Sequence, residues 1–252
     1  RKSKKNKERT DIPRVEMNEL DAEYRSHTRL EEVNLGLTKE QAMQEAQRCL
    51  DCPNPTCMQG CPVSINIPTF VKNIERGEFL EAARVLKETS ALPAVCGRVC
   101  PQEKQCESKC IHLKMGKPAV AIGYLERFAA DYERESGNIS IPEVAEKNGI
   151  KIAVVGSGPA GLSFAGDMAK RGYDVTVFEA LHEIGGVLKY GIPEFRLPNK
   201  IVDVEIEGLR KMGVKFMTNC IVGKTISYDD LHADGFKGIF AASGAGLPNF
   251  MN

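Results

Sequence analysis

The sequence predicts an α+β multidomain chain: an all-α helical domain followed by a partial Rossmann-like α/β domain. Eight of the nine cysteines lie between residues 49 and 110, and a glycine-rich loop follows a predicted strand at 151–155. Beyond residue 150, strand and helix patterns alternate, which is typical of a parallel sheet covered by helices. We therefore divide the chain into an N-terminal arm, a helical domain, a linker and an α/β domain, at residues 1–37, 38–135, 136–150 and 151–252 respectively.

The composition excludes several classes of protein. The 252 residues include 34 Lys+Arg and 34 Asp+Glu, so the net charge is zero and does not favour a protein that coats nucleic acid or anionic membrane. The longest uncharged runs are about fifteen residues and contain Gly, Ser and Pro, which is too short for a transmembrane helix. No apolar signal-peptide core opens the chain. We therefore expect a cytoplasmic protein that binds neither nucleic acid nor membrane.

The N-terminal half of the chain carries helical patterns. The arm begins with a basic run, which we interpret as a solvated terminal segment rather than a docking tail. Thr38 and Gln41 form a capping box, which predicts a helix over 39–50. The spacing of apolar residues predicts two short helices within 68–87 and a further amphipathic helix over 118–133.

The C-terminal half carries the alternating pattern. Its elements are recognised by short β-branched runs, by helical spacing between them and by Gly, Asp and Asn at their ends. The predicted strands are 151–155, 174–178, 214–218 and 238–242, and the predicted helices are 159–171, 199–212 and 228–232.

The cysteines form two quartets. They are Cys49-x2-Cys52-x4-Cys57-x3-Cys61-Pro62 and Cys96-x3-Cys100-Pro101-x4-Cys106-x3-Cys110. Such spacing lets several thiolates converge on a soft metal centre, and a Pro after the last Cys recurs in ferredoxin-type runs. Disulfides do not fit a chain without signs of secretion. Structural zinc favours repeated CxxC pairs, of which one occurs here. We therefore favour iron–sulfur clusters, with zinc as the alternative.

A glycine-rich loop, Gly156-Ser157-Gly158-Pro159-Ala160-Gly161, follows one predicted strand and opens a helix. In a dinucleotide fingerprint the first Gly permits a tight turn, the second lets the backbone approach the pyrophosphate, and the third allows close helix–strand packing. The pyrophosphate would lie on the helix N-terminus. Glu179, at the end of the second strand, would accept hydrogen bonds from the ribose hydroxyls. The loop alone does not distinguish FAD from NAD(P).

The sequence offers no candidate nucleophile–base pair, so we predict no catalytic side chain and expect cofactors to carry the chemistry. The four histidines, His27, His112, His182 and His232, are scattered without metal-ligand spacing. We expect them at the surface.

Three further segments carry a family resemblance. Glu179 followed by Gly185-Gly186 resembles the extended FAD fingerprint of two-dinucleotide-binding-domain flavoproteins. Ser243-Gly244 resembles the segment that those proteins place against FAD, with Ser243 in place of the usual Thr. Together with the cysteine quartets and Gly185–Pro193, these motifs resemble the small subunit of bacterial NADPH-dependent glutamate synthase. They are similar also to the large subunit of bifurcating NADH-dependent ferredoxin:NADP oxidoreductase and to the N-terminal half of dihydropyrimidine dehydrogenase.

The resemblance implies two [4Fe-4S] clusters and an FAD. One cluster would be held by Cys49, Cys52, Cys57 and Cys110, and the other by Cys61, Cys100, Cys106 and the non-cysteine ligand Glu126. Cys96 would then be an unliganded thiol, although counting alone would make it the eighth cysteine ligand. The residues implied to contact the flavin cofactor are Gly156, Ser157, Gly158, Pro159, Ala160, Gly161, Glu179, Ala180, Gly185, Gly186, Leu188, Tyr190, Ile192, Ser243 and Gly244.

The implied function is electron transfer. Hydride from NADPH would reduce FAD, and single electrons would pass through the clusters to a partner. In the family, glutamate formation from glutamine and 2-oxoglutarate belongs to the large subunit of glutamate synthase. No second GxGxxG is present, so we expect this chain to be a fragment and the NADPH site to lie in the missing part. The alternatives are a bifurcating oxidoreductase subunit, a non-enzymatic iron–sulfur adaptor and a zinc-stabilised nucleic-acid module.

Overall fold

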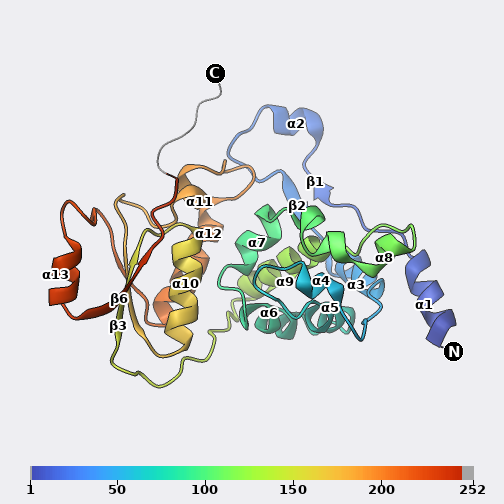
Figure 1. Ribbon diagram of the computed structural model, residues 1–252. Coiled ribbons are helices and arrows are strands. Elements are labelled where there is room, and N and C mark those ends of the chain that lie inside the picture. The colour runs from blue at the N-terminus through green and yellow to red at the C-terminus, as the bar shows by residue number, and fades with distance from the viewer. Residues whose placement is uncertain (1, 246–252) are drawn as a thin grey trace. The chain divides into compact units, whose positions relative to one another are not determined.

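The computed structural model describes residues 2–245, which form two compact units (Figure 1). The first comprises the residues up to Ser140 together with the short segment Glu194–Pro198. The second comprises Ile141–Pro193 and the residues from Asn199 onward. The end of the predicted FAD-binding domain, residues 246–252, lies outside the described residues. No helix within 2–245 is long and apolar enough to cross a membrane.

The first unit is mainly helical. Its helices are α1 (Lys2–Asp11), α2 (Ala22–Ser26), α3 (Lys39–Gln47), α4 (Thr56–Gln59), α5 (Ile67–Glu75), α6 (Phe79–Lys87), α7 (Pro93–Val99), η1 (Gln102–Lys104), η2 (Glu107–Lys109), α8 (Ile111–Lys114) and α9 (Ile122–Ser136). Between residues 38 and 135 every element is helical. The N-terminal arm adds a two-stranded antiparallel sheet, made by β1 (Asn18–Glu19) and β2 (Asn34–Gly36).

The predicted start of α3 is confirmed in atomic detail. The Thr38 hydroxyl oxygen accepts a hydrogen bond from the Gln41 backbone N–H at 3.2 Å, and the Gln41 side chain accepts one from the Thr38 N–H at 2.9 Å. This box satisfies two backbone donors that a helix start leaves free. The helix ends at Gln47, three residues earlier than predicted, because the chain turns there and reaches left-handed backbone at Asp51 (φ 51°).

The core of the helical unit lies between α5, α6 and α9. The two short helices predicted within 68–87 are confirmed as α5 and α6, and Gly77 between them has a positive φ of 79°. Phe70 and Leu86 are fully buried, and the Phe79 ring meets the Phe128 ring edge-on at 5.0 Å. Burial of each such side chain contributes about 1.5–3 kcal/mol relative to exposure.

Part of the N-terminal arm, which was predicted to be solvated, is attached to the helical unit, whereas Lys7 and Glu8 are exposed. Arg9 forms an ion pair with Glu75 at 2.7 Å, and Arg14 forms one with Glu107 at 2.9 Å. Val15 is buried, and its N–H donates to a buried carboxylate. The charge pattern of the arm gave no indication of these partners because they lie far along the chain. The arm is part of the helical unit.

The second unit is a four-stranded parallel sheet with helices. Its elements are β3 (Lys151–Val155), α10 (Pro159–Lys170), β4 (Asp174–Phe178), α11 (Val187–Tyr190), α12 (Asn199–Lys211), β5 (Lys215–Met217), α13 (Tyr228–Ala233) and β6 (Phe236–Ala241). The strand order is β5-β4-β3-β6. Every predicted strand and helix of this half is present. The last strand begins two residues earlier than predicted, and α11 was not predicted.

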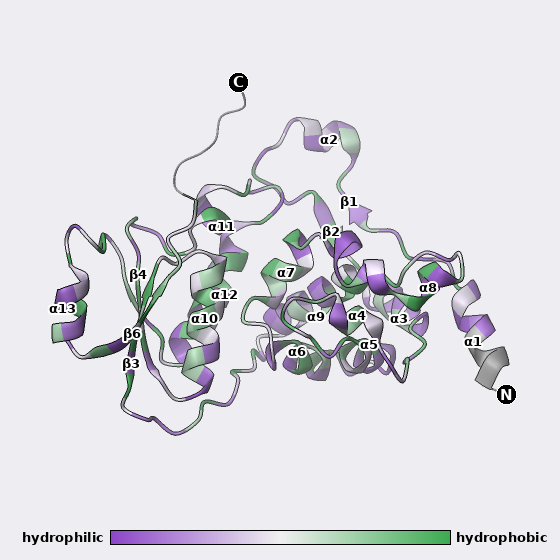
Figure 2. Cartoon of the chain, viewed as in Figure 1, coloured by the Kyte–Doolittle hydropathy of each residue, from purple (hydrophilic) through white to green (hydrophobic). Residues whose placement is uncertain are grey.

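The parallel sheet brings the predicted loops to one edge. Val155, at the end of β3, pairs with Phe178 of β4 and with Ala241 of β6. The carboxyl ends of three strands therefore meet, and ligands of open α/β sheets bind outside such an edge. The middle of the sheet is apolar, as the green colour of β3 and β4 in Figure 2 shows, and Val154 and Val177 are fully buried. This core fixes where the loops begin.

Candidate functional site

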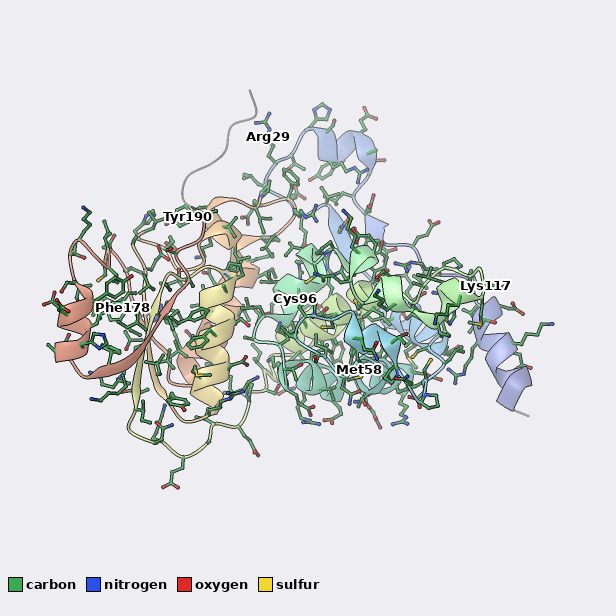
Figure 3. All side chains as sticks on the ribbon, viewed as in Figure 1. Arg29, Met58, Cys96, Lys117, Phe178 and Tyr190 are labelled. Atoms are coloured by element: carbon green, nitrogen blue, oxygen red, sulfur yellow. The ribbon has the colours of Figure 1, made fainter. Side chains whose placement is uncertain are left out.

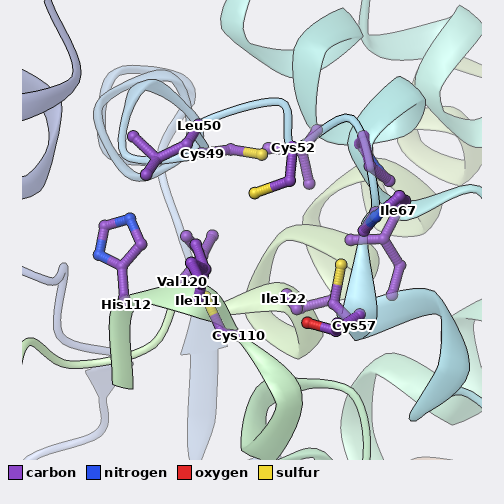
Figure 4. A pocket seen from close by; sticks show the side chains of 14 residues that line it. Cys49, Leu50, Cys52, Cys57, Ile67, Cys110, Ile111, His112, Val120 and Ile122 are labelled. Carbon is purple, nitrogen blue, oxygen red and sulfur yellow. The ribbon is translucent and has the colours of Figure 1, made fainter. Parts of the chain in front are cut away.

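The first group of cysteines shares one cavity (Figure 4). Cys49 follows α3, Cys57 lies on α4, and Cys110 precedes α8. The thiols that line the cavity are Cys49, Cys52, Cys57 and Cys110, the set that the resemblance assigns to one cluster. The rest of the wall is largely apolar and includes Ile67 and Val120. The structure therefore brings four residues from three separate segments to one largely apolar cavity.

Backbone contacts hold these segments in place. Lys72 on α5 donates through Nζ to the Cys49 carbonyl oxygen at 2.7 Å. The Thr56 hydroxyl donates to the Lys109 carbonyl oxygen at 2.6 Å and so ties the segment of Cys57 to that of Cys110. Thiol positions in the cavity are therefore set by hydrogen bonds as well as by chain spacing.

The cavity disfavours free thiolates. Burial raises the pKa of Cys49 and Cys52, and it raises the pKa of Cys57 to about 12. Their neighbouring thiols act in the same direction because like charges would repel. These thiols stay protonated at neutral pH unless a cation compensates the charge, so metal binding would release protons.

The second group of cysteines lies near Glu126 of α9. Cys106 and Glu126 are both buried, and less than a tenth of the surface of each residue is exposed. Burial raises the pKa of Cys106, and the charges of Glu107, Glu126 and Cys61 raise it further. The structure therefore places three of the four ligands predicted for the second cluster close enough to interact.

Cys96 and Cys100 are hydrogen-bonded to each other. This bond raises the pKa of Cys96, with burial and the Glu126 charge adding to the effect, and it lowers the pKa of Cys100. Figure 3 labels Cys96, which lies on α7. Both candidates for the eighth ligand, Cys96 and Glu126, thus lie beside the other thiols of this group, and the choice between them stays a prediction.

Two glycines that the sequence analysis did not single out allow this proximity. A β-carbon on Gly97 of α7 would lie 2.5 Å from the backbone nitrogen of Arg127 on α9. A β-carbon on Gly123 would collide with the Gln102 side chain, which donates to the Cys96 carbonyl oxygen at 3.0 Å. Close approach of α7 and α9 therefore requires glycine at position 97, whereas a side chain at position 123 would displace Gln102.

The donor set fits iron–sulfur clusters. All nine cysteines are free thiols, and no three or more His, Cys, Asp or Glu side chains within residues 2–245 are arranged to hold a single metal ion. In a four-iron cluster each thiolate binds a different iron, so the ligands surround a larger object than one ion. The cavity lined by the first group of cysteines suits a four-iron cluster.

His112 corrects another expectation. It was expected at the surface, but it is fully buried in the wall of the first cavity. Its Nε2 lies 2.9 Å from the Arg48 carbonyl oxygen, and its Nδ1 has no hydrogen-bond partner within the described part of the chain. Burial lowers the pKa of this imidazole, so it is neutral at neutral pH. Its position two residues after Cys110 is the feature of the sequence that could have indicated this burial.

The glycine-rich loop has the geometry of a nucleotide cradle. Gly156 has a φ of 102°, which L side chains rarely adopt, and a β-carbon on Gly161 would lie 2.0 Å from the Gly156 carbonyl oxygen. The predicted tight turn and close packing are thus confirmed. Gly158, the N-cap of the twelve-residue helix α10, faces open space. Free backbone N–H groups beside that space suit a pyrophosphate.

Ser157 connects this loop to the end of β4. Its hydroxyl donates to Glu179 Oε2 and accepts from the Gly185 N–H at 3.0 Å. Glu179 is buried and also accepts the Ser157 N–H at 3.0 Å and the Leu181 N–H at 2.9 Å. The carboxylate predicted to bind ribose therefore already organises the loop. Its contact with a ribose stays a prediction.

The remaining predicted cofactor residues are divided between core and surface. Gly186 has a positive φ of 53°, and a β-carbon there would lie 2.9 Å from Gly158 Cα, so the two loops touch. Leu188 is buried, whereas the Tyr190 hydroxyl lies 3.2 Å from His182 Nδ1. The residues exposed around this edge are Pro159, Ala160, Ala180, Tyr190, Ser243 and Gly244, and Ile192 is half-buried.

Comparison with known families agrees with this geometry. Residues 25–138 match the family model of dihydropyrimidine dehydrogenase domain II, 4Fe-4S cluster, and residues 154–213 match that of an NAD(P)-binding Rossmann-like domain. The predicted family resemblance is confirmed. The chain combines a 4Fe-4S domain of this kind with a Rossmann-like domain.

The chain is also similar to curated proteins. The NAD-dependent dihydropyrimidine dehydrogenase subunit PreT of Escherichia coli (strain K12) is 39% identical over 224 residues, covering 88% of this chain and 54% of its own. The glutamate synthase [NADPH] small chain of the same organism is 39% identical over 205 residues, covering 81% and 43%. That of Azospirillum brasilense is 35% identical over 200 residues, covering 79% and 42%. The chain thus spans about half the length of these relatives.

Proposed function

We propose that this chain is the iron–sulfur and FAD-binding part of an electron-transfer oxidoreductase. The observation that carries the proposal is the cavity shared by Cys49, Cys52, Cys57 and Cys110, within a segment that matches a 4Fe-4S family model. Four thiols from three segments in one apolar space suit a bound cluster, and the buried thiols need its positive charge. We keep a cytoplasmic location as part of the proposal.

The first cluster is held by the four thiols of the cavity, and the second by Cys61, Cys100, Cys106 and Glu126, with Cys96 as the alternative eighth ligand. The thiolates of each group neutralise the iron charge, and the apolar wall excludes water. Both clusters accept and donate one electron at a time when bound. What this chain's own residues supply is therefore position and a low dielectric.

FAD is assigned to the carboxyl edge of the sheet. The N-terminus of α10 and the open face of Gly158 bind the pyrophosphate, Glu179 orients the adenosine ribose, and the loops at Gly186 and Ser243 border the cofactor. The flavin supplies conversion between two-electron hydride transfer and one-electron steps. The same carboxylate would repel a 2′-phosphate, so this edge is unsuited to NADPH. The NADPH site is assigned to the part of the relatives' length that this chain does not span.

The electron acceptor is a partner subunit. The glutamate synthase small chains that match favour the large subunit of a glutamate synthase, which would form glutamate from glutamine and 2-oxoglutarate. The equally similar PreT subunit favours a dihydropyrimidine dehydrogenase instead. The nucleotide in that second case is NAD(H), because the name of that relative is NAD-dependent dihydropyrimidine dehydrogenase subunit.

The test is anaerobic reduction of the native polypeptide that contains this chain. NADPH should bleach the flavin absorption and then produce electron paramagnetic resonance signals from reduced clusters. NADH in its place should act more slowly if the glutamate synthase assignment is right, and faster if the dihydropyrimidine dehydrogenase assignment is right. Flavin that neither nucleotide reduces would contradict the proposal.

A further inference from the structure

A closed ring of two buried guanidinium groups and two partly buried carboxylates joins the arm to the helices α7 and α9. Arg98 Nε lies 2.7 Å from Glu32 Oε1, and Arg98 Nη2 lies 2.8 Å from Asp131 Oδ2. Arg127 completes the ring, at 3.1 Å from Glu32 and 3.3 Å from Asp131. The two guanidinium side chains are 2% and 4% exposed, so their charges depend on the two carboxylates for compensation.

The ring lies at the second cysteine group. Arg98 stands on α7 between Cys96 and Cys100, and Arg127 follows Glu126 on α9. These are the helices that meet at Gly97, where there is no room for a β-carbon. Because guanidinium groups form fixed, planar sets of donors, a ring that holds them also fixes the backbone of their neighbours.

Glu32 is the one corner of the ring that comes from neither helix. It belongs to the arm, whose next residues are also attached: the Asn34 carbonyl oxygen accepts from Arg127 Nη2 at 2.7 Å, and the Val33 N–H donates to the Phe195 carbonyl oxygen at 2.9 Å. Without the Glu32 charge, the two nearly buried cations would share Asp131, which also pairs with Arg134 at 2.7 Å.

We propose that Glu32 is a positioning residue for the second cluster, which acts through Arg98 and Arg127 to hold α7 and α9 at the separation that the ligands need. The inference rests on the proposed second cluster. It assigns a role to an arm residue whose ion-pair partners are Arg98 and Arg127. Arm attachment and cluster retention are thereby linked.

The arm offers a matched control at its other end. Glu75 pairs with Arg9 of the arm, and its side chain is 19% exposed against 17% for Glu32. Its second partner, Lys72, donates to the carbonyl oxygen of Cys49. Glu75→Gln therefore loosens a similar anchor, but beside the first cluster. Glu31→Gln controls for a neutralised arm residue, because the Glu31 carboxylate accepts a hydrogen bond from the exposed Tyr24 hydroxyl at 2.6 Å.

The experiment compares anaerobic iron release to a chelator, and cluster resonance signals, in the unmodified native polypeptide and in the three variants. Glu32→Gln should release half of the iron at least about tenfold faster, a change within the coupling energies of charge networks. The resonance signal of the second cluster should shift while that of the first does not. Glu75→Gln should leave the second signal unchanged, and Glu31→Gln should behave as the unmodified protein.

Equal loss of both clusters in Glu32→Gln and Glu75→Gln would overturn the inference, because the arm would then act only on general stability. An unchanged second cluster in Glu32→Gln would also overturn it. If Glu32→Gln does not fold, Glu32→Asp keeps the charge and should show a smaller change of the same selectivity. Absence of a second cluster from the unmodified protein would instead contradict the proposed function, and that result needs no variant.

Discussion

The candidate site of the helical unit is made of side chains, whereas that of the α/β unit is made mostly of backbone groups. In the helical unit the candidate ligands are side chains, and buried ion pairs such as Glu45–Arg48 fix the segments around them. In the α/β unit the site is mostly backbone: glycines in unusual conformations, a helix N-terminus and one carboxylate that organises the loop. A side-chain site depends on long-range packing, whereas a backbone site depends on local conformation. Substitutions should therefore affect the two sites in different ways.

The largest expected effect is in the helical unit. Cys100→Ser should remove one cluster, about four irons per chain, because a hydroxyl is a poor substitute for a thiolate ligand. Cys96→Ser should leave the iron content unchanged, because the resemblance makes Cys96 the spare thiol. The measurement is iron and acid-labile sulfide per chain. Equal iron loss in both variants would show that Cys96 is the eighth ligand and that Glu126 is not.

Substitution of glycine by alanine, which adds one methyl group, tests how tightly each unit is packed. Gly97→Ala should destabilise the protein by about 1–3 kcal/mol, because its β-carbon meets the Arg127 backbone. Gly208→Ala, on α12, meets nothing within 4 Å and should stabilise by up to about 1 kcal/mol. Urea unfolding followed by circular dichroism measures both. A neutral Gly97→Ala would show that α7 and α9 can separate at little cost.

A smaller effect is expected at the sheet edge. Glu179→Ala should weaken FAD binding at least about tenfold, equivalent to about 1.4 kcal/mol, through loss of charge-assisted hydrogen bonds. Ser157→Ala removes the hydroxyl that donates to Glu179 but keeps the carboxylate, so it separates loop organisation from ribose binding. Flavin fluorescence titration of the native polypeptide gives both affinities. Equal losses would assign Glu179 to loop organisation alone, and unchanged affinity for both would contradict the FAD assignment of this edge.

Local patterns predicted most of the fold. The strands 151–155 and 174–178 were placed to the residue, because β-branched runs between Gly and Asp define a buried parallel strand. The capping box at Thr38 fixed a helix start for the same local reason. The loop glycines Gly156 and Gly161 were assigned correctly because their constraints lie within the loop itself.

Features that depend on distant residues were not predicted. The attachment of the arm needs Glu75 and Glu107, which lie more than sixty residues away along the chain. The need for glycine at position 97 comes from a different helix, and burial of His112 comes from the cavity that the cysteines share. Spacing within a motif carries no information on these partners. The sequence therefore predicted the ligands of the candidate site but not the distant contacts that hold those ligands in place.

The central claim is that the two cysteine groups hold two four-iron clusters and that the carboxyl edge of the sheet binds a flavin. The most direct test is anaerobic purification of the native polypeptide with iron, acid-labile sulfide, zinc and flavin quantified together. We expect about eight irons and eight sulfides per chain, from two clusters of four, together with one FAD and no zinc. About two zinc ions per chain without sulfide, as two closed four-cysteine sites would bind, would contradict it.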